Sequence, residues 1–149
     1  MPVQMELARI FIREMTDMQV IELKEVDGDR SFPIVIGLPE AFAIERRLNG
    51  VDVPRPQTHD LLATLITRLG ARLDRIVIHE LFEGTFYAIL RIDHDGSEID
   101  IDCRPSDAIA LGVSEGVPIF VSEQVLNEIE QDPDAGPPGE SGTAPHDWD

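Results

Sequence analysis

Cysteine and lysine are nearly missing from this chain, which holds one of each, Cys103 and Lys24. A single cysteine excludes an internal disulfide framework and a cysteine-based zinc site. It also suits a reducing compartment. We expect Cys103 itself to behave as a small buried hydrophobic residue.

Long apolar runs are absent as well. No run approaches the roughly 18 to 20 apolar residues that a membrane-spanning helix needs. The first six residues, Met1 to Glu6, have neither the basic start nor the apolar stretch of a signal peptide. We therefore expect a cytoplasmic protein that does not cross a membrane.

Several motifs that mark well-known chemistry are also missing. The sequence has no G-x-x-x-x-G-K-[ST], no G-x-G-x-x-G, no H-E-x-x-H and no G-x-S-x-G. Any chemistry must therefore be sought in residues outside these motifs.

Acidic residues, in contrast, are abundant. They number 29 against 12 lysines and arginines, which gives a formal net charge of −17. Such a surface repels phosphate backbones at long range and argues against passive binding of nucleic acid. It remains compatible with an enzyme that approaches phosphates through bound cations. Solubility is the simpler explanation of the charge.

The length of 149 residues suits one domain. The last stretch, residues 131–149, holds four prolines, three glycines, five acids and no basic residue. It cannot bury enough apolar surface to offset the entropy of ordering it. We expect a folded domain over residues 1–130 and a disordered acidic tail over 131–149.

Short strands and short helices alternate along the predicted domain. Hairpin signals with helices between them predict an α+β fold, with a compact mixed or antiparallel sheet of about seven strands and about four short helices. The predicted strands cover residues 5–12, 18–23, 30–36, 75–81, 85–93, 98–102 and 117–121, and the predicted helices begin near residues 40, 58, 106 and 123.

Three of the predicted helices have an acid in or near the first turn, namely Glu40, Asp60 and Asp107. An acid in the first turn stabilises a helix by about 0.3–1 kcal/mol, which is explanation enough for any one of them. If these helix starts converge, the three carboxylates would instead hold Mg²⁺ or Mn²⁺, because these ions prefer oxygen ligands.

Two segments add groups that can take part in catalysis. Thr58 is suited to capping a helix, and His59 after it is a candidate general base, acid or metal ligand. Arg104 is a candidate phosphate clamp, and Ser106 can cap a helix or bind a phosphate oxygen. The alternatives are a surface histidine at His59 and an internal salt bridge at Arg104.

Residues 98–103 alternate strictly between acidic and apolar side chains. Acids occupy the even positions, and Ile99, Ile101 and Cys103 occupy the odd ones. The pattern predicts a strand with one solvated face and one buried face. A metal-binding ladder of carboxylates is the alternative.

Six runs stand out in order along the chain: Phe32–Gly37, Glu40–Ile44, Pro54–Leu62, Gly84–Ala88, Arg104–Leu111 and Val117–Val121. Together they resemble the bifunctional nuclease domain family, over about residues 5 to 130. Gln57 and Phe42 depart from the commonest pattern of that family. The resemblance implies cleavage of DNA and RNA, a compact α+β domain that self-associates, and importance for Glu40, Thr58, His59, Asp60, Arg104, Ser106 and Asp107.

Two functions follow as hypotheses. The first is a nuclease that depends on Mg²⁺ or Mn²⁺, with metal held by Asp60, Asp107 and Glu40, His59 as general base and Arg104 as clamp on the transition state. The second is a non-catalytic, homo-oligomeric regulatory module that recruits a partner, which the acidic surface favours. Binding of a small ligand at the same cleft is a third alternative.

Overall fold

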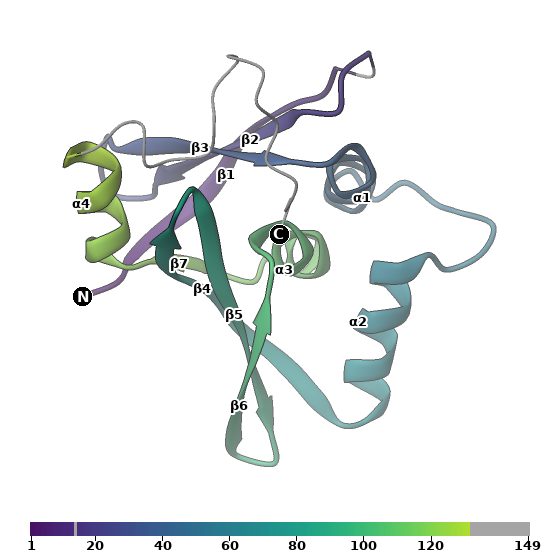
Figure 1. The fold of residues 1–149 in the computed structure, drawn as a ribbon. Coiled ribbons are helices and arrows are strands. Elements are labelled where there is room, and N and C mark those ends of the chain that lie inside the picture. The colour runs from purple at the N-terminus through teal and green to yellow at the C-terminus, as the bar shows by residue number, and fades with distance from the viewer. Residues whose placement is uncertain (14, 132–149) are drawn as a thin grey trace.

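The computed structural model describes residues 1–13 and 15–131, and within these it has seven strands and four α-helices (Figure 1). This arrangement confirms the predicted α+β class. The predicted tail lies outside the described residues, apart from Gln131. In chain order the elements are β1 (Val3–Phe11), β2 (Gln19–Glu25), β3 (Ser31–Ile36), α1 (Leu38–Leu48), α2 (Thr58–Arg68), β4 (Ala71–Phe82), β5 (Thr85–His94), β6 (Ser97–Cys103), α3 (Pro105–Gly112), a 3₁₀ turn (Val113–Glu115), β7 (Ile119–Val121) and α4 (Glu123–Gln131).

All seven strands belong to one mixed sheet in the order β3-β2-β1-β7-β4-β5-β6. Strand β7 pairs antiparallel with β1 and parallel with β4, and the other pairs are antiparallel. The short β7 therefore joins two antiparallel halves, one made of β1–β3 and the other of β4–β6. Strand β6 ends the sheet at one edge.

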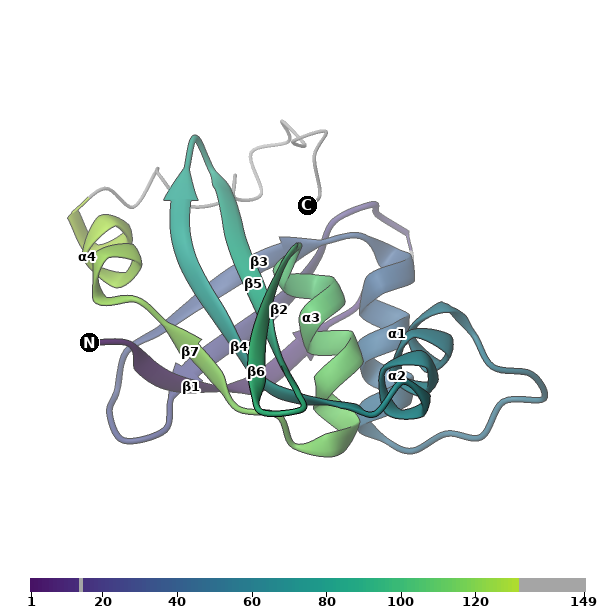
Figure 2. The same ribbon diagram turned by 90° about the horizontal axis from the view of Figure 1, so that it is seen from below.

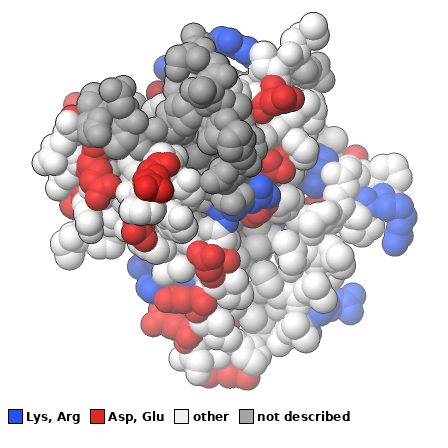
Figure 3. All heavy atoms as spheres, viewed as in Figure 1, with Lys and Arg blue, Asp and Glu red and all other residues white. Residues whose placement is uncertain are grey.

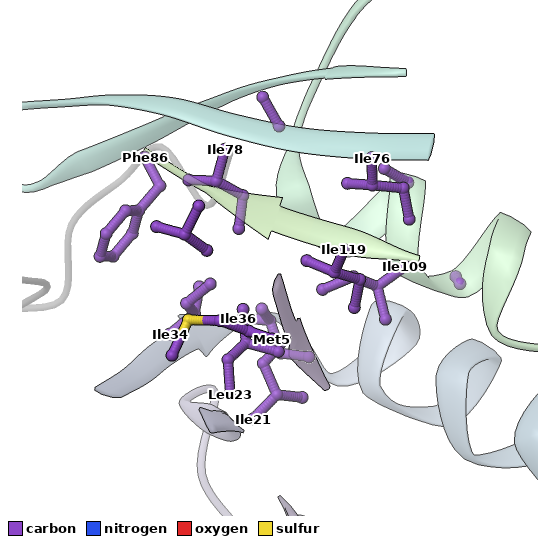
Figure 4. Packing of buried hydrophobic residues seen from close by; sticks show 14 of the residues in the cluster. Met5, Ile21, Leu23, Ile34, Ile36, Ile76, Ile78, Phe86, Ile109 and Ile119 are labelled. Carbon is purple, nitrogen blue, oxygen red and sulfur yellow. The ribbon is translucent and has the colours of Figure 1, made fainter. Parts of the chain in front are cut away.

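The sheet curls so that its two halves face each other. The rings of Phe32 on β3 and Phe86 on β5 lie 5.4 Å apart, although four strands lie between β3 and β5 in the order of the sheet. Figure 4 shows the isoleucines of β4 and β7 above those of β2 and β3, with side chains directed toward one another. Burying these apolar side chains between the halves supplies the main favourable contribution to folding.

The helices divide between the two ends of the curled sheet. Figures 1 and 2 both show α1, α2 and α3 gathered on one side and α4 on the opposite side. Helix α3 is nearly enclosed, with seven of its eight residues buried, whereas α2 has no buried residue. None of the described helices is long and apolar enough to cross a membrane.

Glycines with a left-handed backbone follow two of the helices. Gly50 and Gly70 follow α1 and α2 with φ of 64° and 81°, values that L-residues with a side chain rarely adopt. Strand β4 begins directly after Gly70, earlier than predicted, because Ala71 to Leu73 pair with the end of β5. The extra pairing explains why β4 is longer than its apolar pattern indicates.

Candidate functional site

Asp60 and Asp107 occupy the same position in two helices, since each is the third residue of its helix. Pro105 opens α3, where its fixed φ fits the first helical position and its missing N–H costs nothing. Thr58 opens α2, so the prediction that Thr58 caps this helix is wrong. Gln57 holds the cap position, and its backbone N–H donates to Asp60 Oδ2 at 2.8 Å.

Asp107 lies between a histidine and an arginine. His59 Nε2 is 3.0 Å from Asp107 Oδ1, and Arg104 Nε donates to Asp107 Oδ2 at 2.7 Å. Burial raises the pKa of Asp107, but the contacts with His59 and Arg104 outweigh burial and lower this pKa to about 2. Asp107 is therefore ionised at neutral pH.

Glu40 approaches the same group from α1. Its Oε2 lies 3.9 Å from Arg104 Nη2, and its side chain is largely buried. The histidine side chain is also mostly buried, with 13% of its surface exposed. Three helix starts therefore contribute to one cluster, which we call the His59–Asp107–Arg104 cluster, with Glu40 at its edge.

Asp60 points to different partners. Arg46 Nη2 is 3.1 Å from Asp60 Oδ2, and Arg47 Nη1 donates to Asp60 Oδ1 at 2.5 Å. Burial raises the pKa of Asp60, but the Gln57 N–H and the two guanidinium groups lower it below its ordinary value. The Asp60 carboxylate thus joins the start of α2 to the end of α1.

Arg47 extends this connection to α3. Its Nε donates to the carbonyl of Ala110 at 2.6 Å, and its Nη2 donates to the carbonyl of Leu111 at 3.1 Å and to Ser114 Oγ at 3.0 Å. The side chain satisfies carbonyls at the end of α3, where no further helical turn can do so. Asp60 and Arg47 therefore fix the positions of the three helices that carry the cluster.

A pocket of about 690 Å³ opens beside the cluster. Polar residues and aliphatic side chains both line this pocket. A smaller pocket of about 450 Å³ shares Asp102, Cys103, Arg104 and Asp107 with it, so these residues lie between two hollows. The larger pocket is lined by Pro39, Glu40, Ala43, Gln57, Thr58, His59, Leu62, Ile66, Leu90, Ile92, Ile101, Asp102, Cys103, Arg104, Asp107, Ala108 and Leu111.

The two remaining candidate residues, Thr58 and Ser106, differ in their exposure. Thr58 is exposed and lines the pocket. Ser106 is only 2% exposed, is not among the residues that line the two pockets, and its Oγ has no hydrogen-bond partner in the described part of the chain. A contact between Ser106 and a phosphate would therefore require α3 to move.

Cys103 lines both pockets but is not a reactive thiol. Burial raises its pKa to about 12, and the nearby Asp102 and Asp107 carboxylates add to this effect. Only the thiolate is a strong nucleophile, so the thiol is inert at neutral pH. Cys103 therefore acts as part of the pocket wall.

The three carboxylates predicted to hold a metal do not form a ready ligand set. Among residues 1–13 and 15–131, no group of three or more His, Cys, Asp or Glu side chains is placed to hold a cation. Glu40, Asp60 and Asp107 each face at least one arginine. A divalent cation would have to compete with these arginines, so this arrangement does not fit a preformed metal site.

Sequence reasoning missed the residues that fix the cluster in place. Arg46 and Arg47 end α1 and were not singled out, although adjacent arginines at a helix end are a weak signal of a role with the helix dipole. The apolar wall of the pocket was missed too. Leu62 and Ile66 match ordinary helical periodicity, and nothing in the spacing distinguishes a pocket wall from a core.

Comparison of the sequence with known proteins identifies a family and several relatives. Residues 21–134 match the sequence model of the bifunctional nuclease domain. An uncharacterised protein of Mycobacterium tuberculosis is 43% identical over 123 residues, which are 83% of this chain and 73% of that protein. The protein named bifunctional nuclease 1 of Oryza sativa is 27% identical over 118 residues, which cover 76% of this chain but only 36% of the rice protein.

Proposed function

Because this chain belongs to the bifunctional nuclease domain family, we propose that it hydrolyses phosphodiester bonds of DNA and RNA at the His59–Asp107–Arg104 cluster. One observation carries the proposal. An ionised carboxylate, Asp107, contacts both a histidine and an arginine within 3.0 Å at the wall of a pocket of about 690 Å³. These are the groups that general-base catalysis of a phosphate ester uses.

Asp107 determines which nitrogen of His59 can act as the base. An ionised carboxylate only accepts hydrogen bonds, so the proton of neutral His59 resides on Nε2, the atom that faces Asp107. Nδ1 then keeps its lone pair. This assignment makes His59 Nδ1 the proton acceptor and Asp107 the group that orients the ring.

Arg104 supplies positive charge beside the base. Its guanidinium is part of the wall shared by the two pockets, where a strand passing from one hollow to the other would bring a phosphate near it. Planar guanidinium groups match two phosphate oxygens at once. Arg104 would stabilise the charge that develops on those oxygens in the transition state.

The reaction needs water as the nucleophile, because DNA has no 2′-hydroxyl group. A water molecule attacks the phosphorus atom while His59 Nδ1 takes one of its protons. The bond between phosphorus and the leaving oxygen breaks, and the leaving oxygen is protonated by the imidazolium or by solvent. The products are a phosphate monoester and a hydroxyl, so atoms and charge balance.

Dependence on Mg²⁺ or Mn²⁺ stays a prediction. If an ion takes part, Glu40 and Asp107 are the carboxylates that flank the cluster, and the ion would lower the barrier by neutralising phosphate charge. Asp60 is engaged by Arg46 and Arg47 and is less suited to this role. The steps above therefore use only side chains of the chain itself.

The test uses the purified full chain and end-labelled single-stranded DNA and RNA of the same sequence. Replacing the base, His59→Asn, is expected to lower the cleavage rate by about 10²-fold or more. His94→Asn is the matched control, because His94 lies at the exposed β5–β6 turn, and its rate should equal that of the wild type. Equal rates in His59→Asn and wild type would refute the proposal and indicate a contaminating nuclease.

Chelation supplies the second arm of the test. Each protein is assayed with EDTA and then with added Mg²⁺ or Mn²⁺. Loss of activity in EDTA and its return with either ion would establish metal dependence, whereas full activity in EDTA would refute that prediction and leave the side-chain mechanism.

A non-catalytic regulatory module is the second candidate function. It is favoured by the way each candidate carboxylate already faces an arginine, as in a structural ion pair, and by the net charge of −17. No cleavage of either substrate by wild-type protein, with or without the added ions, would favour this candidate.

A further inference from the structure

The smaller pocket of about 450 Å³ contains an accessible aromatic ring. Tyr87, the one tyrosine of the chain, lies on β5, lines this pocket and is 37% exposed. Phe86 lines it too, but its side chain is buried against Phe32 in the core. Among its described lining residues the larger pocket has no Phe, Tyr or Trp. The smaller pocket is therefore the hollow in which a flat ring can stack on an aromatic side chain.

The pairing of β5 with β6 brings Tyr87 next to Arg104. Ala88 pairs with Cys103, so Tyr87 and Arg104 are the next residues along the two antiparallel segments. Both of them line the smaller pocket, whose volume lies in the range of small-molecule sites. A phosphate held by Arg104 would therefore have a neighbouring base beside the ring of Tyr87.

Strand β6 presents different side chains on its two faces. Ile99 and Ile101 are 43% and 45% exposed, so the prediction that they form a buried face is wrong. Asp102 lies on the opposite face and pairs with Ile89, so it shares its face with Tyr87. The Asp102 carboxylate lines the smaller pocket and makes no hydrogen bond or ion pair within the described part of the chain. Its oxygens are therefore available to a ligand.

We propose that the smaller pocket binds one unpaired base beside the scissile phosphate, stacked on Tyr87, with the amino group of cytosine or adenine donating to Asp102. A carboxylate only accepts hydrogen bonds. It therefore suits the amino groups of these two bases and not the carbonyl oxygen that thymine carries in the same place. The position of the phosphate at Arg104 rests on the proposed function, whereas binding of the base requires no cleavage.

The charge of this surface makes contacts with the base more important than contacts with the backbone. Glu98, Asp100 and Asp102 are exposed along β6, and Figure 3 shows acidic side chains gathered where β6 lies in Figure 1. These acids repel the phosphates on either side of the one held by Arg104. Stacking and a hydrogen bond to the base do not need an attractive backbone. We therefore expect affinity to depend strongly on the base.

Fluorescence anisotropy with short labelled strands of oligo(dC), with and without abasic residues, tests the stacking. The parent protein is the full chain with His59→Asn, so that cleavage does not consume the ligand. Tyr87→Leu in this parent should raise the Kd for oligo(dC) about tenfold, because it removes the ring on which the base stacks. Binding of the abasic strand should not change, and Tyr87→Phe, which keeps the ring, should bind like the parent.

Phe11→Leu is the matched control for the loss of an aromatic side chain. Phe11 is an exposed aromatic residue at the end of β1 and lines neither pocket, so this variant should keep the Kd of the parent. An unchanged Kd in Tyr87→Leu would overturn the proposal. Equal binding of oligo(dC) and the abasic strand by the parent, or no binding of oligo(dC), would overturn it as well.

Replacing Asp102 tests recognition of the amino group. The parent should bind oligo(dC) at least about fivefold more tightly than oligo(dT), and Asp102→Asn should reduce this ratio to within about twofold, because an amide both donates and accepts. Asp100→Asn is the matched control, since it removes the same charge from the same face of β6, where Asp100 pairs with Arg91 outside both pockets. Its ratio should equal that of the parent. No preference for oligo(dC) in the parent, or an unchanged ratio in Asp102→Asn, would overturn the proposal.

Cleavage assays on the wild-type chain separate this proposal from the proposed function. Binding that depends on the base, together with no cleavage by wild type, would support the base site and refute the nuclease function. Cleavage by wild type, together with unchanged binding and cleavage in Tyr87→Leu, would overturn the base site and leave the nuclease function standing.

Discussion

Asp60 and Asp107 are each the third residue of a helix, yet they have different surroundings. Asp60 contacts Arg46, Arg47 and a backbone N–H, and these contacts join α1 to α2. Asp107 contacts His59 and Arg104 at the wall of two pockets. Both carboxylates have a lowered pKa, so the shift alone does not distinguish a structural role from a chemical one.

The two carboxylates differ in the chemistry of their partners and in whether those partners line the pocket of about 690 Å³. The partners of Asp60 are arginines, which keep their protons at any physiological pH and serve only to bind. The partners of Asp107 include a histidine, a side chain that can act as a general acid or base, and both partners line the pocket. We therefore propose a structural role for Asp60 and a catalytic role for Asp107, and four predictions test this division.

The largest expected effect is on cleavage. Asp107→Asn should lower the rate on single-stranded DNA by about 10²-fold or more, because a neutral amide no longer fixes the protonated nitrogen of His59. Asp60→Asn, assayed well below its melting temperature, should stay within about threefold of wild type. Rates that fall equally in both variants would remove the division between the two carboxylates.

The second effect is on stability. Asp60→Asn should lower the free energy of unfolding by about 2 kcal/mol, because it leaves the largely buried Arg46 and Arg47 without their carboxylate. Urea denaturation followed by circular dichroism measures this loss. Asp52→Asn, at an exposed acid in the loop before α2, is the control and should change the midpoint little. A similar loss in both variants would contradict the structural role of Asp60.

The third effect depends on pH. The folded-state pKa of Asp107 is about 2, below the ordinary value of 3.8. A lowered pKa contributes stability that is fully present above about pH 4 and is lost as the pH falls toward 2. After allowance for solvent screening we expect about 1 kcal/mol from this group. The stability difference between wild type and Asp107→Asn, measured by urea denaturation, should therefore shrink from pH 6 to pH 3, and a constant difference would contradict the shift.

The smallest effect concerns the start of α2. Thr58→Ala should change the free energy of unfolding by less than about 0.5 kcal/mol, because Thr58 is the first helical residue and not the cap. Loss of a true threonine cap typically costs about 1 kcal/mol. A melting temperature lowered by several degrees would show that the hydroxyl of Thr58 does cap the helix.

Local patterns predicted much of the fold. Alternating residues marked β6, and local signals placed the other strands and the starts of the four helices. These features depend on neighbours within a few positions in the chain, which the sequence displays directly. The family resemblance, now supported by the match over residues 21–134, added weight to the helix starts.

Other features depended on residues far apart in the chain. Asp60 pairs with arginines 13 and 14 positions earlier, and His59 contacts Asp107 48 positions later. No spacing rule relates such positions. The exposure of Ile99 and Ile101 was also hidden, because alternation shows that one face of a strand is apolar but not what covers it.

The sequence by itself determined the alternation of strands and helices, the acids at the helix starts and the apolar stripes on α2 and β6. Each of these follows from local backbone preference and side-chain periodicity. Only the tertiary structure decided which acid meets a histidine, which acid meets arginines, and which apolar stripe stays open. The curl of the sheet brings α1, α2 and α3 to one side of the fold, and contact across that distance has no signature in a single sequence.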